Sequence, residues 1–301
     1  MILVFGTVCI DRVRRIPFLP ESGGYVEIEE QFDVLGGEAA NTANALNSWG
    51  VESELWGNSL GDGIEADTLR ALLNAKGLAN RVAATLITPP TPICDVLVTP
   101  NGERTMIGRG FAAMDPGVDP EGIRYVPGSW FVAEPNMRRA AHTAAWHAFE
   151  AGMKLYLMDY SDPESLPRGS YWQSSTDWFG TRNNTQKNVT WVQDWVAKTG
   201  SFAILSDGPN GFVAGSPEYP VRAYPPYPAP AVVDTTGAGD VFRAGMVYGL
   251  SQGWPIHRCL QFASAAGCLK CRALGATTDV PTIDEIERHI QQHASVTRQF
   301  S

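Results

Sequence analysis

The chain has 301 residues, of which 32 are acidic and 23 are basic, so its formal net charge at pH 7 is −9. Apolar residues make up 44 % and charged residues 18 %, which excludes a disordered or fibrous protein. The acidic balance also argues against a nucleic-acid partner, because duplex binding requires a clustered basic surface. The length suits one large α/β domain or one domain with a small appendage.

The first apolar segment, residues 2–9, predicts a buried strand rather than a signal peptide, because no basic leader precedes it and Asp11 interrupts it. No apolar run reaches the roughly 18–20 residues that span a bilayer, so no membrane association is expected. The five cysteines, an odd number, are typical of reduced thiols and favour a cytoplasmic location. The N-x-T sequons at Asn183 and Asn188 are therefore not interpreted as glycosylation sites.

The body of the chain alternates apolar strand segments with helical segments. This alternation predicts right-handed crossovers and an α/β fold with a mostly parallel central sheet. The Pro- and Tyr-rich segment 217–231 is expected to run along the surface as an ordered loop. We expect strands at 2–9, 53–58, 129–133, 154–159, 203–206 and 211–214, and helices at 37–49, 63–76, 136–151, 188–199, 240–253, 256–273 and 282–294.

Two other regions predict a second, smaller sheet. Residues 25–32 alternate apolar and charged side chains, which is typical of a strand with one wet face. Asn101-Gly102 lies between two apolar runs and indicates a β-hairpin. The strands at about 12–35 and 92–110 are therefore expected to form a small antiparallel sheet inserted into a single domain that spans the chain.

The segment with the clearest chemistry is Gly237-Ala238-Gly239-Asp240, at the predicted start of a helix. Small residues let the backbone approach a ligand closely, and the first amides of a helix bind phosphate or a developing negative charge. A carboxylate would repel phosphate here unless it had a task. The obvious task for Asp240 is to accept a proton from an attacking hydroxyl. The alternative is a simple helix start with a favourable first-turn charge.

Several motifs occur in the order found in one enzyme family. The string from Asp234 to Gly245, DTTGAGDVFRAG, resembles the C-terminal signature of the ribokinase/pfkB family of carbohydrate and nucleoside kinases. The resemblance covers nearly the whole chain and implies a ribokinase-like three-layer α/β/α core with a small antiparallel β lid. Further matching motifs are Gly6-x-x-x-x-Asp11, the segment GGEAANTANAL from Gly36, Leu60-Gly-Asp-Gly63, Ser206-x-Gly208-x-x-Gly211 and Leu274-Gly-Ala276.

In this family, Asp240 would be the general base that takes a proton from a substrate hydroxyl as it attacks the γ-phosphorus of ATP. The resemblance implies that the amides of Gly237, Ala238 and Gly239 form an anion hole and that Mg²⁺ neutralises further charge. The implied activity is phosphate transfer from ATP to a small carbohydrate of the fructose, ribose or ketodeoxygluconate type.

By the same resemblance, the sugar would contact Asp11, Gly36, Gly37 and Asn41. Outside the matched motifs, Asp11 is a turn residue at a strand end and Asn41 an ordinary helix residue. Arg109 resembles an arginine that some fructokinase-like and ketodeoxygluconate-kinase-like members place near the substrate, and a solvated loop arginine is an equal alternative. The inserted strands would form a lid that excludes water and could mediate a homodimer.

The resemblance also implies that Ser206, Gly208 and Gly211 line the nucleotide. Asn183 and Gln186 match the family's Asn-x-x-Glu, in which the carboxylate helps to organise Mg²⁺ through water. Gln186 lacks that charge, which puts in doubt either the full activity or the alignment of this segment.

Asp234, with the carbonyl of Thr236 and carbonyls near 271–275, could hold a monovalent cation such as K⁺, as in many relatives. Glu38 stands where many members carry a small or basic residue, and an acid there disfavours a phosphorylated sugar as acceptor.

Other hypotheses have less support. Cys268-Leu-Lys-Cys271 lies within a predicted helix without a second ligand pair, so neither zinc binding nor redox chemistry is expected. A dinucleotide oxidoreductase is disfavoured because no G-x-G-x-x-G follows the first strand. Within the same fold, a nucleoside kinase with an acceptor such as adenosine remains open. So does a sugar-binding homologue with weakened catalysis, for which Gln186 is the only argument.

Overall fold

A computed structural model describes residues 1–81, 88–114 and 119–300. Its largest element is a nine-stranded sheet with the order β13-β12-β11-β10-β9-β8-β1-β4-β5. Neighbours from β11 to β5 are parallel, whereas β12 and β13 are antiparallel at one edge, so the predicted mostly parallel sheet is confirmed. The strands are β1 (Ile2–Gly6), β4 (Ser53–Gly57), β5 (Asn80–Arg81), β8 (Trp130–Ala133), β9 (Lys154–Met158), β10 (Tyr171–Ser175), β11 (Phe202–Ser206), β12 (Phe212–Gly215) and β13 (Arg222–Tyr224).

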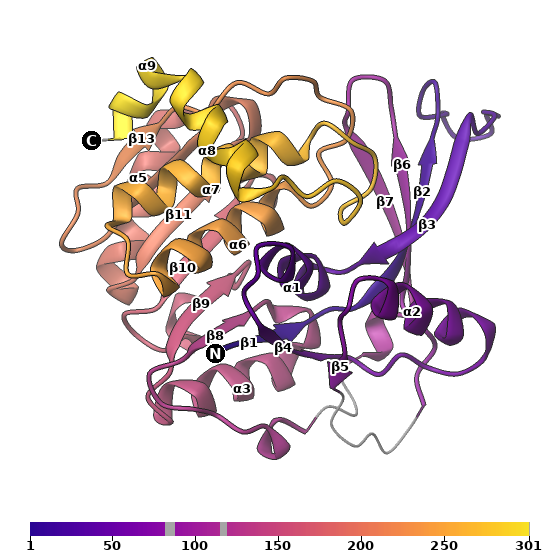
Figure 1. The fold of residues 1–301 in the computed structure, drawn as a ribbon, viewed down its shortest axis with the longest axis horizontal. Coiled ribbons are helices and arrows are strands. Elements are labelled where there is room, and N and C mark those ends of the chain that lie inside the picture. The colour runs from indigo at the N-terminus through magenta and orange to yellow at the C-terminus, as the bar shows by residue number, and fades with distance from the viewer. Residues whose placement is uncertain (82–87, 115–118, 301) are drawn as a thin grey trace.

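Helices cover both faces of this sheet (Figure 1). Every helix predicted from the sequence is present, and its ends lie within three residues of those expected. The long helices are α1 (Glu38–Ser48), α2 (Gly63–Ala75), α3 (Arg138–Glu150), α5 (Thr185–Thr199), α6 (Ala238–Ser251), α7 (Ile256–Lys270) and α8 (Ile283–Gln292), and the short ones are α4 (Thr176–Phe179) and α9 (Ala294–Thr297).

Alternate residues of β1 divide the core into two layers. Ile2 and Val4 pack with residues of α1, α6 and α7, whereas Leu3 and Phe5 pack with residues of α3 and α5. Because side chains alternate across a strand, this is the pattern of a sheet buried on both faces. The core is therefore the three-layer α/β/α arrangement of a ribokinase-like fold.

The second sheet has four strands in the order β3-β2-β6-β7. They are β2 (Cys9–Arg15), β3 (Glu30–Gly36), β6 (Ile93–Val98) and β7 (Arg104–Arg109), and β6 and β7 flank the predicted Asn101-Gly102 turn. β2 pairs with β3, and β6 with β7, in antiparallel fashion, but β2 and β6 are parallel. The wholly antiparallel prediction is wrong in this respect, because β2 continues outward from β1 and β6 runs in the same direction (Figure 1).

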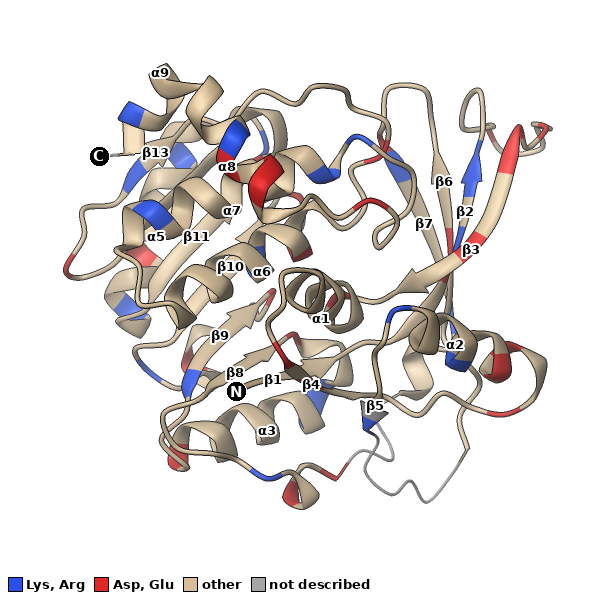
Figure 2. Cartoon of the chain, in the orientation of Figure 1, with Lys and Arg blue, Asp and Glu red and all other residues tan. Residues whose placement is uncertain are grey.

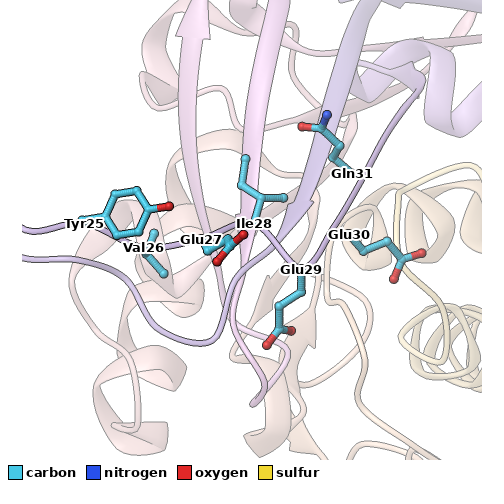
Figure 3. Close-up of a pocket in the computed structure, with 7 residues that line it drawn as sticks. All are labelled: Tyr25, Val26, Glu27, Ile28, Glu29, Glu30 and Gln31. Carbon is cyan, nitrogen blue, oxygen red and sulfur yellow. The ribbon is translucent and has the colours of Figure 1, made fainter.

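The alternating segment 25–32 is a strand only at its end, because β3 begins at Glu30. Residues from Tyr25 to Glu29 precede the strand and line a pocket together with Glu30 and Gln31 (Figure 3). Tyr25 is 81 % exposed, so no core covers this end of the small sheet. Alternation alone therefore overestimated the length of the strand.

Three strands of the large sheet are missing from the sequence-based assignment. β5 is the two-residue strand at one edge, β10 lies between β9 and β11, and β13 lies within the segment 217–231 that was expected to be a loop. None of the helices in the described parts of the chain is both long and apolar enough to cross a membrane. Figure 2 shows basic and acidic positions interspersed over the large sheet and its helices, with basic positions on β2 and acidic ones on β3 of the small sheet.

Candidate active site

The candidate site lies where the parallel strands of the large sheet end and α6 begins. Thr7 follows β1, Glu134 follows β8 and Asp159 follows β9. In open α/β sheets this carboxyl edge is where ligands bind. The small sheet leaves the core at the same edge, because β1 leads into β2 after only two residues (Figure 1).

The start of α6 has the geometry of an anion site. Gly237 precedes the helix with a φ of 80°, in the left-handed region. A Cβ on Gly237 would lie 2.8 Å from the Cβ of Ala276, so the turn requires glycine. Gly239 is exposed, and its carbonyl accepts a hydrogen bond from Nε2 of Gln173 at 3.0 Å. With the small Ala238 between them, these residues leave the backbone of the first turn open to a ligand.

Asp240 is buried in that first turn and is only 6 % exposed. Its Oδ2 accepts a hydrogen bond from Nδ2 of Asn41 at 2.8 Å, and its Oδ1 lies 3.3 Å from Nη2 of Arg243. Burial raises the pKa of Asp240, while Arg243, the hydrogen bond from Asn41 and the charge of Arg104 oppose the rise. Two elements therefore hold this carboxylate, α1 through Asn41 and α6 through Arg243.

Asp11 lies against the turn that leads into α1. A Cβ on Gly36 would be 2.1 Å from Cγ of Asp11, so the carboxyl group occupies the space that a side chain at position 36 would need. Gly37 has a φ of 94°, and a Cβ there would lie 2.3 Å from the carbonyl oxygen of Thr7. Burial raises the pKa of Asp11 to about 7, opposed by a hydrogen bond from the Cys9 thiol and reinforced by Asp240. The double glycine thus brings the backbone of α1 against this carboxyl group.

Three further carboxylates surround this pair. Glu134 is fully buried and accepts hydrogen bonds from Asn136 and from the backbone and hydroxyl of Thr7. Asp159 accepts a hydrogen bond from Ser174 at 2.5 Å. Burial raises the pKa of Glu38 well above its usual value, and the charges of Glu134, Asp159 and Asp240 raise it further.

Sequence reasoning singled out Glu38 as a departure from the family pattern but missed Glu134 as a member of the site. Asp159 was expected only as the last residue of the predicted strand 154–159. The sequence does contain one indication of their place in the site, because Glu134 and Asp159 each directly follow a buried strand.

The residues expected at the nucleotide lie around the end of β11. Ser206 donates to the carbonyl of Ser174 at 3.1 Å. Gly211 has a φ of 88°, and a Cβ there would lie 2.1 Å from the carbonyl oxygen of Tyr224. Gly208 has a φ of 52° and is exposed. Sequence reasoning missed Asp207, whose carboxylate binds Thr176 and the backbone of Asn183.

Asn183 and Gln186 lie at the start of α5. The side-chain oxygen of Asn183 accepts a hydrogen bond from Nδ2 of Asn210 at 2.6 Å, which places it beside the Gly208–Gly211 turn. Gln186 is exposed, and its backbone carbonyl accepts from Thr190. Asn183 is thus connected to the expected nucleotide loop through Asn210.

Asp234 fastens the loops around α6. Its Oδ1 accepts from the amide and the hydroxyl of Thr236 at 2.8 and 2.6 Å, and its Oδ2 accepts from the amide of Gly275 at 2.7 Å. Asp234 is fully buried. Oδ1 therefore serves the loop that precedes Gly237, and Oδ2 serves the separate loop at Gly275.

The two arginines of β7 have different surroundings. Arg109 has a side chain that is 61 % exposed, and it forms an ion pair with Glu65 of α2. Arg104 instead donates to the hydroxyl of Thr235 at 3.0 Å, two residues before Gly237. The hairpin of the small sheet therefore brings Arg104, which sequence reasoning did not single out, toward the start of α6.

The structure thus groups the predicted residues in three places. Asp11, Gly36, Gly37, Asn41 and Asp240 lie together, because Asn41 binds Asp240 and Asp11 packs on Gly36. Ser206, Gly208, Gly211 and Asn183 form a second group around Asp207. Arg109 makes its ion pair on the surface with α2.

A family model described as "pfkB family carbohydrate kinase" matches residues 1–168 and 175–283. A protein of Dictyostelium discoideum described as an uncharacterized sugar kinase is 31 % identical, with 96 % of this chain and 97 % of that protein covered. These matches span both the large and the small sheet.

Solved structures support the same fold. A ribokinase of Arabidopsis thaliana, solved with ribose and ATP, superposes with a TM-score of 0.72 at 19 % identity, covering 96 % of this chain and 98 % of that one. A nucleoside kinase of Burkholderia thailandensis, solved with inosine, superposes with a TM-score of 0.74 at 17 % identity, covering 98 % and 97 %. From the family match and the ribokinase-like fold together, we conclude that this chain belongs to the pfkB family of carbohydrate kinases and is a phosphotransferase that acts on an alcohol group.

Proposed function

We propose that this protein is an ATP-dependent sugar kinase in which Asp240 is the general base. The observation that carries the proposal is the position of Asp240, buried in the first turn of α6 directly after Gly237-Ala238-Gly239 and held by Asn41. An acceptor hydroxyl beside this carboxylate can lose its proton to Asp240 while its oxygen attacks the γ-phosphorus of ATP, the bond from that phosphorus to the β,γ-bridging oxygen breaks and ADP leaves. The amides of the first turn then stabilise charge on the transferred phosphoryl group.

Unpartnered polar atoms support a polyhydroxylated acceptor. Within the described residues, Oε2 of Glu38, Oδ1 of Asn41 and Nη1 of Arg243 are buried and lack hydrogen-bond partners. Buried polar atoms are normally paired, so a ligand is expected to complete them. Sugar hydroxyls can donate to Glu38 and Asn41 and can accept from Arg243, and Asp11 can accept two more.

The charge balance around the site favours a neutral sugar. Asp11, Glu38 and Asp159 accompany Asp240, whereas the opposing cations are Arg243 and Arg104. An acceptor with a phosphate or carboxylate near Glu38 would meet like charge, which is a common device for excluding a wrong substrate. We therefore propose fructose- or ribose-type acceptors ahead of the ketodeoxygluconate type.

ATP and Mg²⁺ follow from the proposed reaction, with Ser206, Gly208, Gly211 and Asn183 along the nucleotide. No cluster of three or more His, Cys, Asp or Glu side chains suited to a metal occurs in the described part of the chain. This fits an ion bound mainly through the ATP phosphates, as Mg²⁺ often is. Gln186 is exposed and uncharged, and we assign it no more than a contact through water.

A monovalent cation such as K⁺ is part of the proposal through Asp234 and the carbonyl of Thr236. Because hydrogen bonds already engage both oxygens of Asp234, the ion would rely on backbone carbonyls for most of its ligands. Activity measured with and without K⁺ in the assay buffer tests this part.

The direct test is ADP release with fructose, ribose, ketodeoxygluconate and adenosine as separate acceptors. We expect release with a neutral sugar, and Asp240→Asn should lower its kcat by at least ~10²-fold, the usual scale for loss of a general base. Glu287→Gln, in an ion pair on α8, is the control and should leave kcat unchanged. A folded Asp240→Asn variant with normal turnover would falsify the assignment.

The nucleoside kinase is the second candidate, supported by the fold shared with the kinase solved with inosine. Adenosine as the sole accepted substrate would establish it over the sugar kinase. A sugar-binding homologue with weakened catalysis would instead bind a sugar without releasing ADP.

We further propose that the whole chain acts as one kinase domain with the small sheet as its lid, in the cytoplasm. The exposed apolar side chains of β7, Met106 and Ile107, make the small sheet the proposed surface of a homodimer.

A further inference from the structure

We propose that Arg243 is a positioning residue that keeps the carboxylate of Asp240 ionised and aimed at the acceptor. The inference rests on the proposed role of Asp240 as general base. It assigns a task to a side chain that lies inside the Asp234–Gly245 string but to which the family resemblance gave no role.

Arg243 is buried next to the carboxylate of Asp240. Arg243 is fully buried, which is rare for an arginine unless its charge is paired. Its nearest carboxylate is that of Asp240, one helical turn earlier, with Nη2 3.3 Å from Oδ1. The arginine therefore has an electrostatic partner at the proposed base.

Hydrogen bonds to α1 fix the guanidinium of Arg243. Nε donates to the hydroxyl of Thr42 at 2.8 Å, and Nη2 also donates to the carbonyl of Glu38. Thr42 in turn donates to the same carbonyl at 2.9 Å. Both acceptors belong to the first turns of α1, the helix that also carries Asn41. The guanidinium is thus held between α1 and α6 and cannot rotate away from Asp240 without breaking these contacts.

Most of the charged side chains around Asp240 and Arg243 are carboxylic acids. The charged groups that interact with Asp240 or Arg243 from neighbouring elements are Asp11 of β2, Glu38 of α1, Glu134 after β8, Asp159 after β9 and Arg104 of β7, and the phenols of Tyr156 and Tyr160 also face Arg243. Apart from the two phenols, all but Arg104 are carboxylic acids. Arg104 belongs to the hairpin of the small sheet, so Arg243 is the cation built into the core at this place.

The positive charge of Arg243 favours the ionised form of Asp240, which is the form that can act as a base. Burial favours protonated Asp240, and a protonated carboxyl group cannot accept the proton of the acceptor hydroxyl. A positive charge at this distance lowers the pKa of a carboxyl group by about 1–3. Removing the charge of Arg243 should therefore move the acid limb of the pH profile of kcat/KM to higher pH.

The experiment compares pH profiles of kcat/KM for fructose or ribose, whichever the wild type phosphorylates faster. Arg243→Met should move the acid limb upward by about 1–3 pH units, and Arg243→Lys, which keeps the charge, should return the limb most of the way to its wild-type position. Thr42→Ala removes the acceptor for Nε and the hydroxyl's bond to the Glu38 carbonyl but leaves the charge of Arg243, so it should lower kcat without moving the acid limb. Arg258→Met, which breaks a separate ion pair on α7, is the matched control. An acid limb that stays in place in a folded Arg243→Met variant overturns the proposal.

A second measurement needs no substrate. Removing one member of a buried ion pair leaves an uncompensated charge, whereas removing both does not. At pH 8, Asp240→Asn should therefore raise the urea midpoint of the Arg243→Met protein. If the double variant is no more stable than Arg243→Met, the coupling to Asp240 is refuted. If the pair is coupled but the wild type phosphorylates no acceptor, it is the proposed function that fails.

Discussion

Asp11, the proposed sugar ligand on β2, shows how a residue placed for binding can oppose folding. Its carboxyl group is buried against Gly36, and burial raises its pKa to about 7. The folded protein therefore binds this proton more tightly than the unfolded chain does. Its contribution to stability is fully present below the ordinary pKa of a carboxyl group and is lost as the pH rises toward 7, by about 1.4 kcal/mol for each pH unit in that window.

Asp11→Asn should consequently stabilise the unliganded protein at pH 8 by more than at pH 5. Urea unfolding at the two pH values measures the difference, and Asp284→Asn in the exposed first turn of α8 is the control. The same substitution of Asp11 should abolish ADP release with every sugar. Equal effects on the unfolding free energy at both pH values would contradict the assigned pKa.

Glu38 provides a second test at this scale, on the choice of acceptor. Because the pKa of Glu38 is raised, the side chain gains its repulsive charge only as the pH increases. Wild-type preference for fructose over fructose phosphate should therefore grow as the pH is raised. Glu38→Gln should remove this pH dependence and lower the preference at pH 9 by about tenfold or more. Glu52→Gln, at an exposed position before β4, should behave as wild type.

At the scale of elements, the hairpin between β6 and β7 connects the small sheet to the start of α6. The carbonyl of Gly102 accepts from both the amide and the hydroxyl of Thr235, at 3.3 and 3.2 Å. Arg104 donates to the same hydroxyl, and Glu103 pairs with Arg182 beyond β10 at 3.1 Å. The tip of the hairpin is therefore attached to the loop that leads into the proposed anion hole.

Thr235→Val should loosen this attachment without unfolding the core. Loss of a side-chain hydrogen bond costs about 1 kcal/mol, so amide exchange in residues 99–104 should accelerate roughly fivefold. Hydrogen exchange with mass spectrometry measures this rate. Thr68→Val on α2, whose hydroxyl binds only within its own helix, is the control. Unchanged exchange at 99–104 would show that Thr235 does not hold the hairpin.

Elements also show where sequence reasoning succeeds and where it stops. The helix at 63–75 was predicted to within a residue because its apolar spacing is local information. β10 was missed because Gln173 and Ser174 are polar, and they are buried only through bonds to Gly239 and Asp159 from distant parts of the chain. β13 is three residues long and depends on its pairing with β12.

The same limit applies to the site. Asp240, Asp11 and Asn41 belong to motifs that suggest their roles, whereas Glu134 lies outside these motifs. Arg243 lies inside the Asp234–Gly245 string, but the string does not reveal its role. Glu134 is separated from Thr7 by 127 positions, and only the neighbouring positions of β1 and β8 bring them together. Arg243 is indistinguishable in sequence from a surface arginine, because its burial depends on the packing of α1 on α6.

At the scale of the whole molecule, the small sheet exposes apolar side chains that the core does not cover. Met106 and Ile107 on the edge strand β7 are each 57 % exposed. An edge strand with exposed apolar residues is a template for association, here proposed to be with a second copy of the chain.

Ile107→Glu should therefore convert a dimer into a monomer, because a buried, unpaired carboxylate opposes the contact. Light scattering after gel filtration measures the mass. Trp178→Glu, at a 69 % exposed aromatic residue on α4, is the control and should leave the mass unchanged. A monomeric wild type at high concentration would rule out the proposed dimer.

The two residues between β1 and β2 have a mechanical consequence. Glu134 holds the backbone and hydroxyl of Thr7, and Oδ1 of Asn58 binds the amide of Val8 at 2.7 Å. The connection of Thr7 and Val8 is too short and too firmly held to allow a large rotation of the small sheet relative to the core. Asp11 follows this connection, on β2. Any rotation of the small sheet must therefore move Asp11 with it, so the proposed contact of Asp11 with the sugar and the angle between the two sheets change together.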